Sequence, residues 1–386
     1  MQYRQFNEEI DWKPSALGFG MMRLPTIGEK RELSAIDDVR AKKMVRHAID
    51  NGLNYIDTAW PYHGGESEKF VGRVLQNGYR GKVKLATKMP SWEIERHSDL
   101  DKFFNKQLVR LKTDYIDFYL LHGLNKDRWE NYKDVNVFEW VEKVKDEDKI
   151  GHIGFSFHDD LNTFKEIVDF YGWDFCQIQY NYMDQDFQAG KEGLKYAADQ
   201  GLGVVIMEPL RGGQLATELP EEVLKVFENA GIERSPVGWS LLWLWNQPEV
   251  SVVLSGMSNL NQVKENLKIA DNSQIGKLTE EEQEIIERAR EVYEELLPVN
   301  CTGCNYCATQ GFNSCSHGIE IPNLFDLYNK AHIYEDYEKR KEKYYDMGQG
   351  SRASACIECE ECEEKCPQNL PITDLLKEIA EYFERE

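Results

Sequence analysis

The chain has 386 residues, of which 41% are hydrophobic, and its formal net charge is −22. This balance argues against a nucleic-acid partner, because affinity for DNA and RNA comes largely from Lys and Arg side chains that neutralise phosphates. No apolar run approaches the ~20 residues that a membrane-spanning helix requires. The start of the chain, MQYRQ, is polar and lacks the basic and apolar regions of a secretory signal. We therefore expect a soluble, cytoplasmic protein that binds neither nucleic acid nor membrane.

Short apolar runs rich in β-forming residues recur along most of the chain, and longer amphipathic segments separate them. This alternation is typical of βα units around a parallel sheet. Eight such units favour a closed (β/α)8 TIM barrel over an open sheet, and a barrel of this kind takes ~250 residues. The predicted strands cover residues 16–20, 55–57, 83–88, 116–122, 151–155, 175–180, 203–207 and 250–254.

Two of the intervening helices carry clear signals. Residues 41–51 have apolar side chains at helical spacing and are followed by Gly52, a common helix stop. Thr279 is followed three residues later by Glu282, which has the form of a capping box. This motif predicts a helix over residues 279–296.

The character of the sequence changes after Pro298. The remainder is rich in Cys, Glu and Tyr and has little strand pattern. Within it, residues 321–345 are predicted to form a charged helix. We therefore predict two domains, a barrel over residues 1–298 and a small, mainly helical module over residues 299–386.

Eight of the nine cysteines lie in this second region, between Cys301 and Cys366. In a reducing compartment thiols persist, so metal or cluster binding is favoured over disulfide formation. The last four cysteines form the run Cys-x2-Cys-x2-Cys-x3-Cys-Pro of bacterial ferredoxins, in which three thiolates bind one cluster and the fourth binds its neighbour. A zinc site is the alternative, but the four cysteines of a zinc site usually come as two separated Cys-x2-Cys pairs. The ferredoxin run consists of Cys356, Cys359, Cys362 and Cys366, followed by Pro367.

The earlier cysteine group departs from this pattern at its end. Its fourth cysteine, Cys315, follows after seven residues and precedes Ser316 instead of a proline. If the ferredoxin crossover holds, one [4Fe–4S] cluster takes Cys301, Cys304, Cys307 and Cys366. The other then takes Cys356, Cys359, Cys362 and Cys315. The ninth cysteine, Cys176, lies within a predicted strand and is expected to be a buried packing residue.

Acidic residues are interleaved with the second cysteine group. One interpretation of these residues is a solvated charged face, and the other is a source of negative potential that disfavours adding an electron to the cluster. The second interpretation suits exchange with a low-potential, ferredoxin-like electron carrier. The residues are Glu358, Glu360, Glu361, Glu363 and Glu364.

Polar residues stand at the ends of three consecutive predicted strands. Asp57 ends the second strand, Lys88 the third and His122 the fourth, while Tyr62 lies in the loop after Asp57. Each of them alone has a structural explanation. Catalysis in a TIM barrel takes place at the C-terminal ends of its strands, so together they indicate an active site.

The segment at residues 54–68, NYIDTAWPYHGGESE, resembles the signature of the aldo-keto reductase family. Residues 86–88, ATK, and 117–122, DFYLLH, match the next two blocks of the family, and the resemblance extends over about residues 15–270. It implies a catalytic tetrad of Asp57, Tyr62, Lys88 and His122.

The chemistry of such a tetrad is coherent. Reduction of a carbonyl needs a hydride at carbon and a proton at oxygen, and a phenol with a pKa of ~10 is a poor acid near neutral pH. We expect the Lys88 ammonium to lower the pKa of Tyr62, Asp57 to hold Lys88 charged, and His122 to bond the carbonyl oxygen. Tyr62 is then the proton donor.

The same resemblance implies a nicotinamide site along the later strands. Gln177 corresponds to the residue that holds the carboxamide, and Ser156 belongs to a Gly-x-Ser-Asn motif whose Asn is replaced by Phe157. Met207 stands where many relatives have an aromatic residue that stacks on the ring. The implied cofactor-binding residues are Ser156, Gln177, Met207, Pro209, Leu210, Gly256, Met257, Ser258, Gln262 and Asn266.

The block after the eighth strand leaves the cofactor type open. The helix predicted after this strand has its N-terminus placed to receive an anion, such as a phosphate of the cofactor. Relatives that prefer NADPH often have Lys or Arg here, whereas this chain has Gly256, Met257 and Gln262, with Lys264 nearby. NADPH is the family default and NADH the alternative.

We expect an NAD(P)H-dependent oxidoreductase with a small carbonyl or alcohol substrate, and two [4Fe–4S] clusters that serve electron transfer or structure. Nicotinamide gives two electrons and a cluster accepts one, and no convincing flavin motif bridges them. The alternative function is an electron-transfer or scaffold iron–sulfur protein with a silent barrel, against which the intact tetrad argues.

Overall fold

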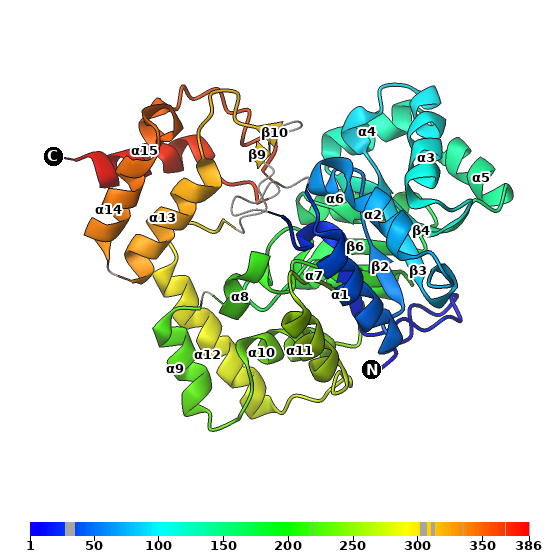
Figure 1. Ribbon diagram of the computed structural model, residues 1–386, viewed down its shortest axis with the longest axis horizontal. Helices are drawn as coiled ribbons and strands as arrows, with labels where there is room; N and C mark the ends of the chain where they lie inside the picture. Colours follow the sequence, from blue (N-terminus) through cyan, green and yellow to red (C-terminus); the bar gives the residue numbers. More distant parts are fainter. Residues whose placement is uncertain are drawn as a thin grey trace. The chain divides into compact units, whose positions relative to one another are not determined.

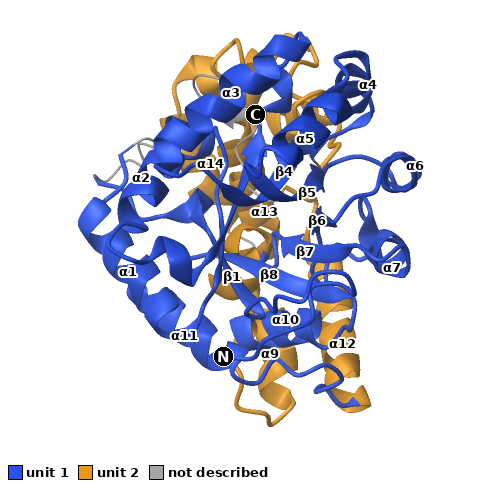
Figure 2. Ribbon diagram, turned by 90° about the vertical axis from the view of Figure 1, so that its right-hand side faces the viewer, with its two compact units in different colours: residues 1–210, 237–279 blue, residues 211–236, 280–386 orange. Residues whose placement is uncertain are grey.

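The computed structural model describes residues 1–27, 35–217, 219–301, 307–309, 313–334, 336–366 and 368–385. Cys304 and Pro367 of the predicted cysteine motifs lie outside the described residues. The chain forms two compact units, one of Met1–Leu210 with Val237–Thr279 and the other of Arg211–Pro236 with Glu280–Glu386 (Figure 2). The predicted domain boundary at residue 298 stays a prediction.

The first unit contains a closed barrel in which each strand pairs with the next and β8 pairs in parallel with β1. All eight predicted strands are present, so the predicted TIM barrel is confirmed (Figure 1). The strands are β1 (Leu17–Gly20), β2 (Tyr55–Asp57), β3 (Lys84–Met89), β4 (Ile116–Leu124), β5 (Ile150–Phe157), β6 (Phe175–Gln179), β7 (Gly203–Met207) and β8 (Val250–Gly256).

Helices surround the strands of this unit (Figure 2). The predicted helix over 41–51 is present as α1 (Asp38–Asp50), where the Asp37 side chain caps the first turn by accepting from Arg40 N. The remaining helices are α2 (Ser67–Val74), α3 (His97–Leu111), α4 (Lys126–Asp134), α5 (Val137–Asp146), α6 (Leu161–Phe170), α7 (Gly190–Asp199), α10 (Pro236–Trp245) and α11 (Leu260–Ala270). Short 3-10 turns are η1 (Met21–Arg23), η2 (Tyr62–Gly65), η3 (Arg80–Lys82) and η4 (Ser91–Glu93).

The N-terminal segment closes the end of the barrel where the strands begin. The Phe6 ring lies 4.9 Å from that of Phe118 and 5.9 Å from that of Phe175, between ring centroids. Gly203, the first residue of β7, makes room for it, since a Cβ at this position would lie 2.4 Å from Phe6 Cε1. With this end filled by apolar side chains, the opposite end remains for polar chemistry.

The second unit combines the segment after β7 with the C-terminal part of the chain. The helix predicted over 279–296 is present as α12 (Glu280–Leu296), and Arg234 Nη2 donates to Glu282 Oε1 at 2.5 Å. The other elements are η5 (Arg211–Gly213), α8 (Gln214–Thr217), α9 (Glu221–Asn229), β9 (Ala308–Thr309), β10 (Asn313–Ser314), α13 (Ile321–Ile333), α14 (Tyr337–Asp346), η6 (Gln349–Ser351), η7 (Ala353–Ala355) and α15 (Ile372–Glu384).

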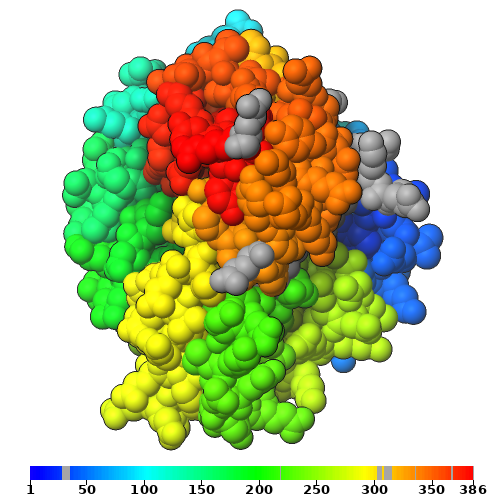
Figure 3. Space-filling view, turned by 90° about the vertical axis from the view of Figure 1, so that its left-hand side faces the viewer, coloured from blue at the N-terminus to red at the C-terminus, as the bar shows by residue number. Residues whose placement is uncertain are grey.

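The stretch predicted as one charged helix over 321–345 forms two helices, α13 and α14, which pack with α15. The side chains of α15 that are buried, among them Leu376, Ile379 and Phe383, recur at the spacing of one helical face. The Phe383 ring stacks between Tyr337, at 5.9 Å, and Tyr344, at 4.9 Å. Tyr328 of α13 also contacts Phe383, with ring centroids 6.5 Å apart, so one aromatic core holds both helices. Figure 3 shows the orange α14 and the red α15 as adjoining parts of one surface.

None of the helices in the described part of the chain combines the length and the apolar character that crossing a membrane requires.

Candidate active site and cysteine pocket

Asp57 and Lys88 form an ion pair at the C-terminal ends of β2 and β3. Lys88 Nζ donates to both carboxylate oxygens of Asp57, at 2.7 and 2.8 Å, and to the carbonyl oxygen of Thr58 at 2.9 Å. Parallel pairing places Asp57 opposite Ala86, two residues before Lys88, which explains why the two side chains meet. Lys88 is 1% exposed and Asp57 2% exposed, so the pair is shielded from water.

Tyr62 and His122 complete the group that the sequence predicted. Lys88 Nζ lies 3.3 Å from Tyr62 Oη and donates to it. The rings of Tyr62 and His122 are nearly perpendicular, with centroids 6.1 Å apart. The structure therefore brings together all four residues of the predicted tetrad, from β2, η2, β3 and β4.

The pKa of Tyr62 differs from the prediction. Burial raises it well above 10, and the nearby carboxylates of Asp57 and Glu208 raise it further. The predicted net lowering of this pKa is therefore wrong for this pocket, because burial and the two carboxylates outweigh the hydrogen bond from Lys88, which by itself favours the phenolate. The physical reason is that Asp57, 2.7 Å from Lys88 Nζ, balances the ammonium charge, so the cost of burying a phenolate dominates.

His122 is held as a neutral imidazole. Burial lowers its pKa well below 6.5, and the charges of Lys88 and Arg128 act in the same direction. Its Nδ1 atom is buried and has no hydrogen-bond partner among the described residues. The Trp92 ring packs beside it, with centroids 5.1 Å apart. A neutral imidazole in this position can donate one hydrogen bond to a carbonyl oxygen.

Gln177, the predicted carboxamide ligand, also supports the ion pair, because its Nε2 donates to Asp57 Oδ2 at 3.2 Å. This second contact was not evident from the sequence. The Gln177 Oε1 atom is buried and lacks a partner in the part of the chain that the structure describes. An acceptor of this kind fits the N–H of a carboxamide. Ser156 is buried nearby and accepts from Gly123 N at 2.7 Å.

The predicted cofactor residues at β7 and β8 lie at the same end of the barrel, and several are bonded within the chain. Met207 ends β7 half-buried, Pro209 is buried, Leu210 is half-buried, Gly256 is exposed and Met257 is buried. Asn266 Nδ2 donates to Ser255 Oγ at 2.8 Å.

The N-terminus of α11 is less available to an anion than the sequence suggested. The Asn259 side chain accepts from the backbone N–H groups of Asn261 and Gln262, both at 3.0 Å. Gln262 Oε1 in turn accepts from Ser258 N at 2.7 Å. Side chains of this segment therefore occupy two amide donors of the first helical turn, and a third just before the helix.

Two charged residues at this end of the barrel were missed by the sequence analysis. Arg23 follows β1 and Glu208 follows β7, and Arg23 Nη2 lies 3.7 Å from Glu208 Oε1. The signal that found Asp57 and Lys88, a charged residue just after a strand, would have found them too.

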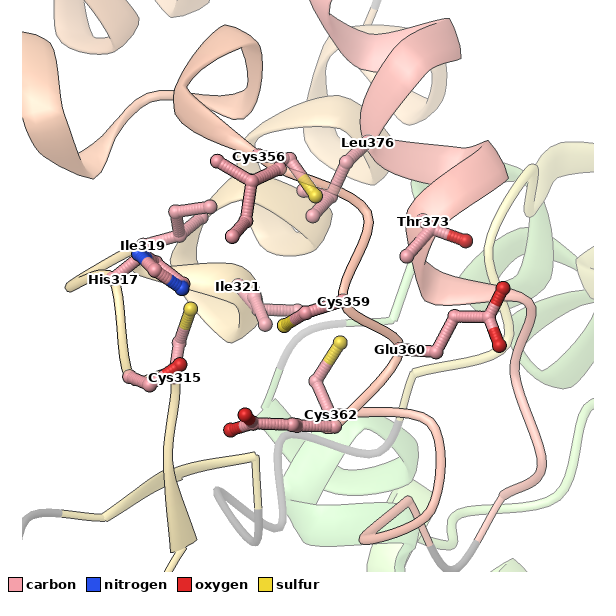
Figure 4. A pocket seen from close by; sticks show the side chains of 13 residues that line it. Cys315, His317, Ile319, Ile321, Cys356, Cys359, Glu360, Cys362, Thr373 and Leu376 are labelled. Carbon is pink, nitrogen blue, oxygen red and sulfur yellow. The ribbon is translucent and has the colours of Figure 1, made fainter.

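Cys315 lies with three cysteines of the ferredoxin run, Cys356, Cys359 and Cys362, around one pocket that is partly open to solvent. Figure 4 shows Cys315, Cys356, Cys359 and Cys362 pointing into it. Cys366 does not line this pocket, although it packs in the same core as Cys301, Cys307, Cys315, Cys356 and Cys362. In the described part of the chain, no three His, Cys, Asp or Glu side chains converge on a point that could hold a single metal ion.

The loop between Cys356 and Cys362 has a strained backbone. Glu358 and Glu360 have φ angles of 59° and 61°, in the left-handed region that non-glycine residues rarely adopt. Such turns direct successive N–H groups inward and favour a bound anion. Glu358 N accordingly donates to Cys356 Sγ at 3.4 Å. The loop geometry fits an anionic iron–sulfur group.

The chemistry of the thiols also fits such a group. Burial, together with the neighbouring Glu363, Cys315 and Cys356, raises the pKa of Cys362 to about 12. Four neighbouring thiolates need a cationic centre to balance their charge, and iron supplies it in a cluster. Cys176, by contrast, is fully buried in β6, as predicted.

Comparisons with known proteins support both the barrel and the cysteine-rich C-terminal region. The aldo/keto reductase family model matches residues 16–291, and the 4Fe-4S dicluster domain model matches residues 300–370. The uncharacterized oxidoreductase YqkF of Bacillus subtilis (strain 168) is 31% identical over 299 residues, which are 69% of this chain and 90% of YqkF.

Further relatives extend this similarity. The NADH-specific methylglyoxal reductase of Escherichia coli (strain K12) is 26% identical over 264 residues, covering 56% of this chain and 78% of that protein. The holo form of aldo-keto reductase AKR11C1 from Bacillus halodurans superimposes with a TM-score of 0.62 at 28% identity, covering 75% of this chain and 96% of that one.

Proposed function

Because this chain belongs to the aldo/keto reductase family and carries a C-terminal 4Fe-4S dicluster domain, we propose that it transfers hydride between NAD(P)H and a small carbonyl or alcohol substrate. The observation that carries the proposal is the buried Lys88–Asp57 pair, with Tyr62 Oη at 3.3 Å and the His122 ring beside it. A cytoplasmic location, expected from the sequence, is part of the same proposal.

In this mechanism Tyr62 donates the proton. Its raised pKa keeps the phenol protonated near neutral pH. The alkoxide that forms when hydride reaches the carbonyl carbon is a far stronger base, with a conjugate-acid pKa of ~16, close to that of water. Proton transfer from Tyr62 is therefore downhill without a lowered phenol pKa.

The other tetrad residues position and stabilise Tyr62. Lys88 donates to Tyr62 Oη and stabilises the phenolate that remains after proton transfer. Asp57 holds Lys88 charged, and neutral His122 donates a hydrogen bond to the substrate oxygen, which polarises the carbonyl.

A bound nicotinamide supplies the hydride, and Gln177 is the residue that fits its carboxamide best. The unpartnered Gln177 Oε1 can accept the carboxamide N–H, while Nε2 remains bonded to Asp57. The cofactor is NADPH or NADH. Residues 256–262 contain no Lys or Arg, so NADH is as compatible with this block as NADPH.

We further propose that two [4Fe–4S] clusters are bound with ligands exchanged between the cysteine groups. One takes Cys301, Cys304, Cys307 and Cys366, and the other takes Cys315, Cys356, Cys359 and Cys362. The pocket that Cys315 shares with the second set supports this assignment. The clusters serve structure or one-electron exchange with a ferredoxin-like carrier.

The test is an anaerobic assay of the full chain with NADPH, NADH and a panel of small aldehydes. We expect Tyr62→Phe to lower kcat by at least about 100-fold, in the range typical of a lost general acid. The matched control is Tyr196→Phe, which removes a phenol that bonds Asp169 on the outer helices. Unchanged turnover in Tyr62→Phe would refute the mechanism.

A further inference from the structure

Arg128 lies beside His122, the residue that would bond the carbonyl oxygen of the substrate. Arg128 Nη1 donates at 2.7 Å to the carbonyl oxygen of Gly123, which directly follows His122 in β4. The Trp92 ring contacts both residues, since its centroid is 5.7 Å from the guanidinium carbon of Arg128 and 5.1 Å from the centroid of the His122 ring. A cation therefore stands next to the group that would bind the carbonyl.

The position of Arg128 is fixed at both ends of the residue. Its backbone N–H, in the first turn of α4, donates to the Asn125 side chain at 2.9 Å. Its guanidinium is held against Gly123, where a Cβ would lie 3.1 Å from Nη1. Gly123 also has φ at 58°, which glycine adopts without strain. An arginine held in this way loses little further conformational freedom when it binds an anion.

A second imidazole, His158, lies on the same side of the site. It follows β5, and its Cδ2 would be 3.8 Å from a Cβ at Gly123. Burial, together with the charge of Arg128, lowers the pKa of His158 to about 4. Both imidazoles beside Arg128 are therefore neutral near pH 7 and leave the charge on this side of the site to the guanidinium.

The charges around the site differ between its two sides. In addition to burial, the Asp57 carboxylate acts to raise the pKa of Tyr62. In addition to burial, the cations Lys88 and Arg128 act to lower the pKa of His122. Lys88 is paired with Asp57 at 2.7 Å, whereas Arg128 adds positive charge on the His122 side. A carbonyl compound between Tyr62 and His122 would therefore be favoured if it carried negative charge on the His122 side.

We infer that the substrate is a short oxo acid, whose carboxylate is bound by Arg128 while His122 bonds its carbonyl oxygen. The inference rests on the proposed function. A guanidinium binds carboxylate oxygens through charge-assisted N–H bonds, which a neutral substrate would lack. The acid is short because Arg128 and His122 contact the same Trp92 ring.

The carboxylate takes no part in the bond changes. The carbonyl carbon receives hydride from the reduced nicotinamide, which is oxidised, and the carbonyl oxygen receives the proton of Tyr62. The product is a hydroxy acid with its carboxylate unchanged. Arg128 thus determines which carbonyl compound is bound and where its carbonyl lies.

The experiment compares kcat/KM for two oxo acids with kcat/KM for their own methyl esters, in anaerobic assays of the full, cluster-containing chain. The acids are 2-oxopropanoate and 4-oxobutanoate, which differ in the separation of carboxylate and carbonyl. Each ester keeps the carbonyl and removes the negative charge. We expect the native chain to prefer the acid of at least one pair.

The variants are judged by the acid-to-ester ratio of kcat/KM, because a general loss of activity cancels in this ratio. Arg128→Gln removes the charge and keeps an N–H donor for Gly123. We expect it to lower the ratio by roughly 10- to 100-fold, the loss typical of a hydrogen bond to a charged group. Arg128→Lys should give an intermediate ratio, and it maintains the test if Arg128→Gln fails to fold.

Lys126→Gln is the matched control. Lys126 is an exposed cation in the same helical turn, so its loss should leave the ratio within two-fold of native. A fall as large as that of Arg128→Gln would mean that the general charge of this surface, and not Arg128, selects the acid.

The outcomes separate this inference from the proposed function. If the native chain prefers neither acid to its ester, or if the Arg128 variants keep both ratios within two-fold of native, the inference fails and the proposed function stands. If the native chain reduces none of these compounds and no small aldehyde with NADPH or NADH, the proposed function fails, and this inference fails with it.

Discussion

Lys88 Nζ donates to both carboxylate oxygens of Asp57, at 2.7 and 2.8 Å, inside a barrel where both residues are almost fully buried. This contact pairs two opposite charges in a buried site, and Lys88 Nζ also donates to Tyr62 Oη. It also predicts how the site responds to substitution and to pH.

Replacing Asp57 with Asn should leave the Lys88 charge buried without its counterion. Breaking a buried pair in this way costs about 3–5 kcal/mol. Urea unfolding of Asp57→Asn should report a loss of that size, together with lost reductase activity. Asp50→Asn is the control, because Asp50 pairs with Lys82 at the exposed surface and its loss should hardly change stability. Similar stabilities for the two variants would contradict the prediction.

The pH dependence of carbonyl reduction should be flat around neutrality. The pKa of Tyr62 is raised well above 10, so the phenol stays protonated, and the pKa of His122 is well below 6.5, so the imidazole stays neutral. We expect kcat/KM to vary by less than about two-fold between pH 7 and 9.5, because free-enzyme ionisations control this parameter. A steady decline of kcat/KM within this range would mean that the net pKa of Tyr62 is lowered and would contradict the prediction.

Cys315→Ser should remove one of the four ligands of one cluster and leave the ligands of the other cluster intact. We expect iron and sulfide to fall from about eight to about four atoms of each per chain, because two four-iron clusters are proposed. Cys176→Ala is the matched control, since Cys176 is buried in β6 and should leave the iron content unchanged. Full iron and sulfide in Cys315→Ser would refute the exchange of ligands between the cysteine groups.

Lys112→Gly should stabilise the barrel. Lys112 ends α3 with φ at 52°, a conformation that glycine adopts without strain, and its side chain is exposed. We expect a gain of about 0.5–1 kcal/mol in the free energy of unfolding. Lys112→Ala retains the Cβ and should show no gain, so equal stability of the two variants would argue against backbone strain at this position.

Much of the fold and the site was accessible from sequence because the relevant signals are local. Each strand of the barrel is a short apolar run, and the closed topology then brings strand ends together. Asp57, Lys88 and His122 could therefore be grouped before their contacts were known. The same argument applied to Arg23 and Glu208 would have grouped these two as well.

The two helices α13 and α14 show where local signals were insufficient. The composition of residues 321–345 indicates helix throughout, yet the chain forms two helices, and Tyr328 of α13 and Tyr344 of α14 both pack on Phe383 of α15. Tertiary packing around one aromatic core determines where the two helices separate, and helix propensity alone does not predict this position.

The sequence by itself determined the family, the barrel and the spacing of the cysteines, and it predicted the tetrad residues, because motifs and residues at strand ends carry this information. Only the tertiary structure decided the direction in which the pKa of Tyr62 shifts, the pairing of Arg23 with Glu208, and the position of Cys315 at the pocket of Cys356, Cys359 and Cys362. These properties depend on burial and on distances between residues far apart in the chain, and both arise only when the chain is folded.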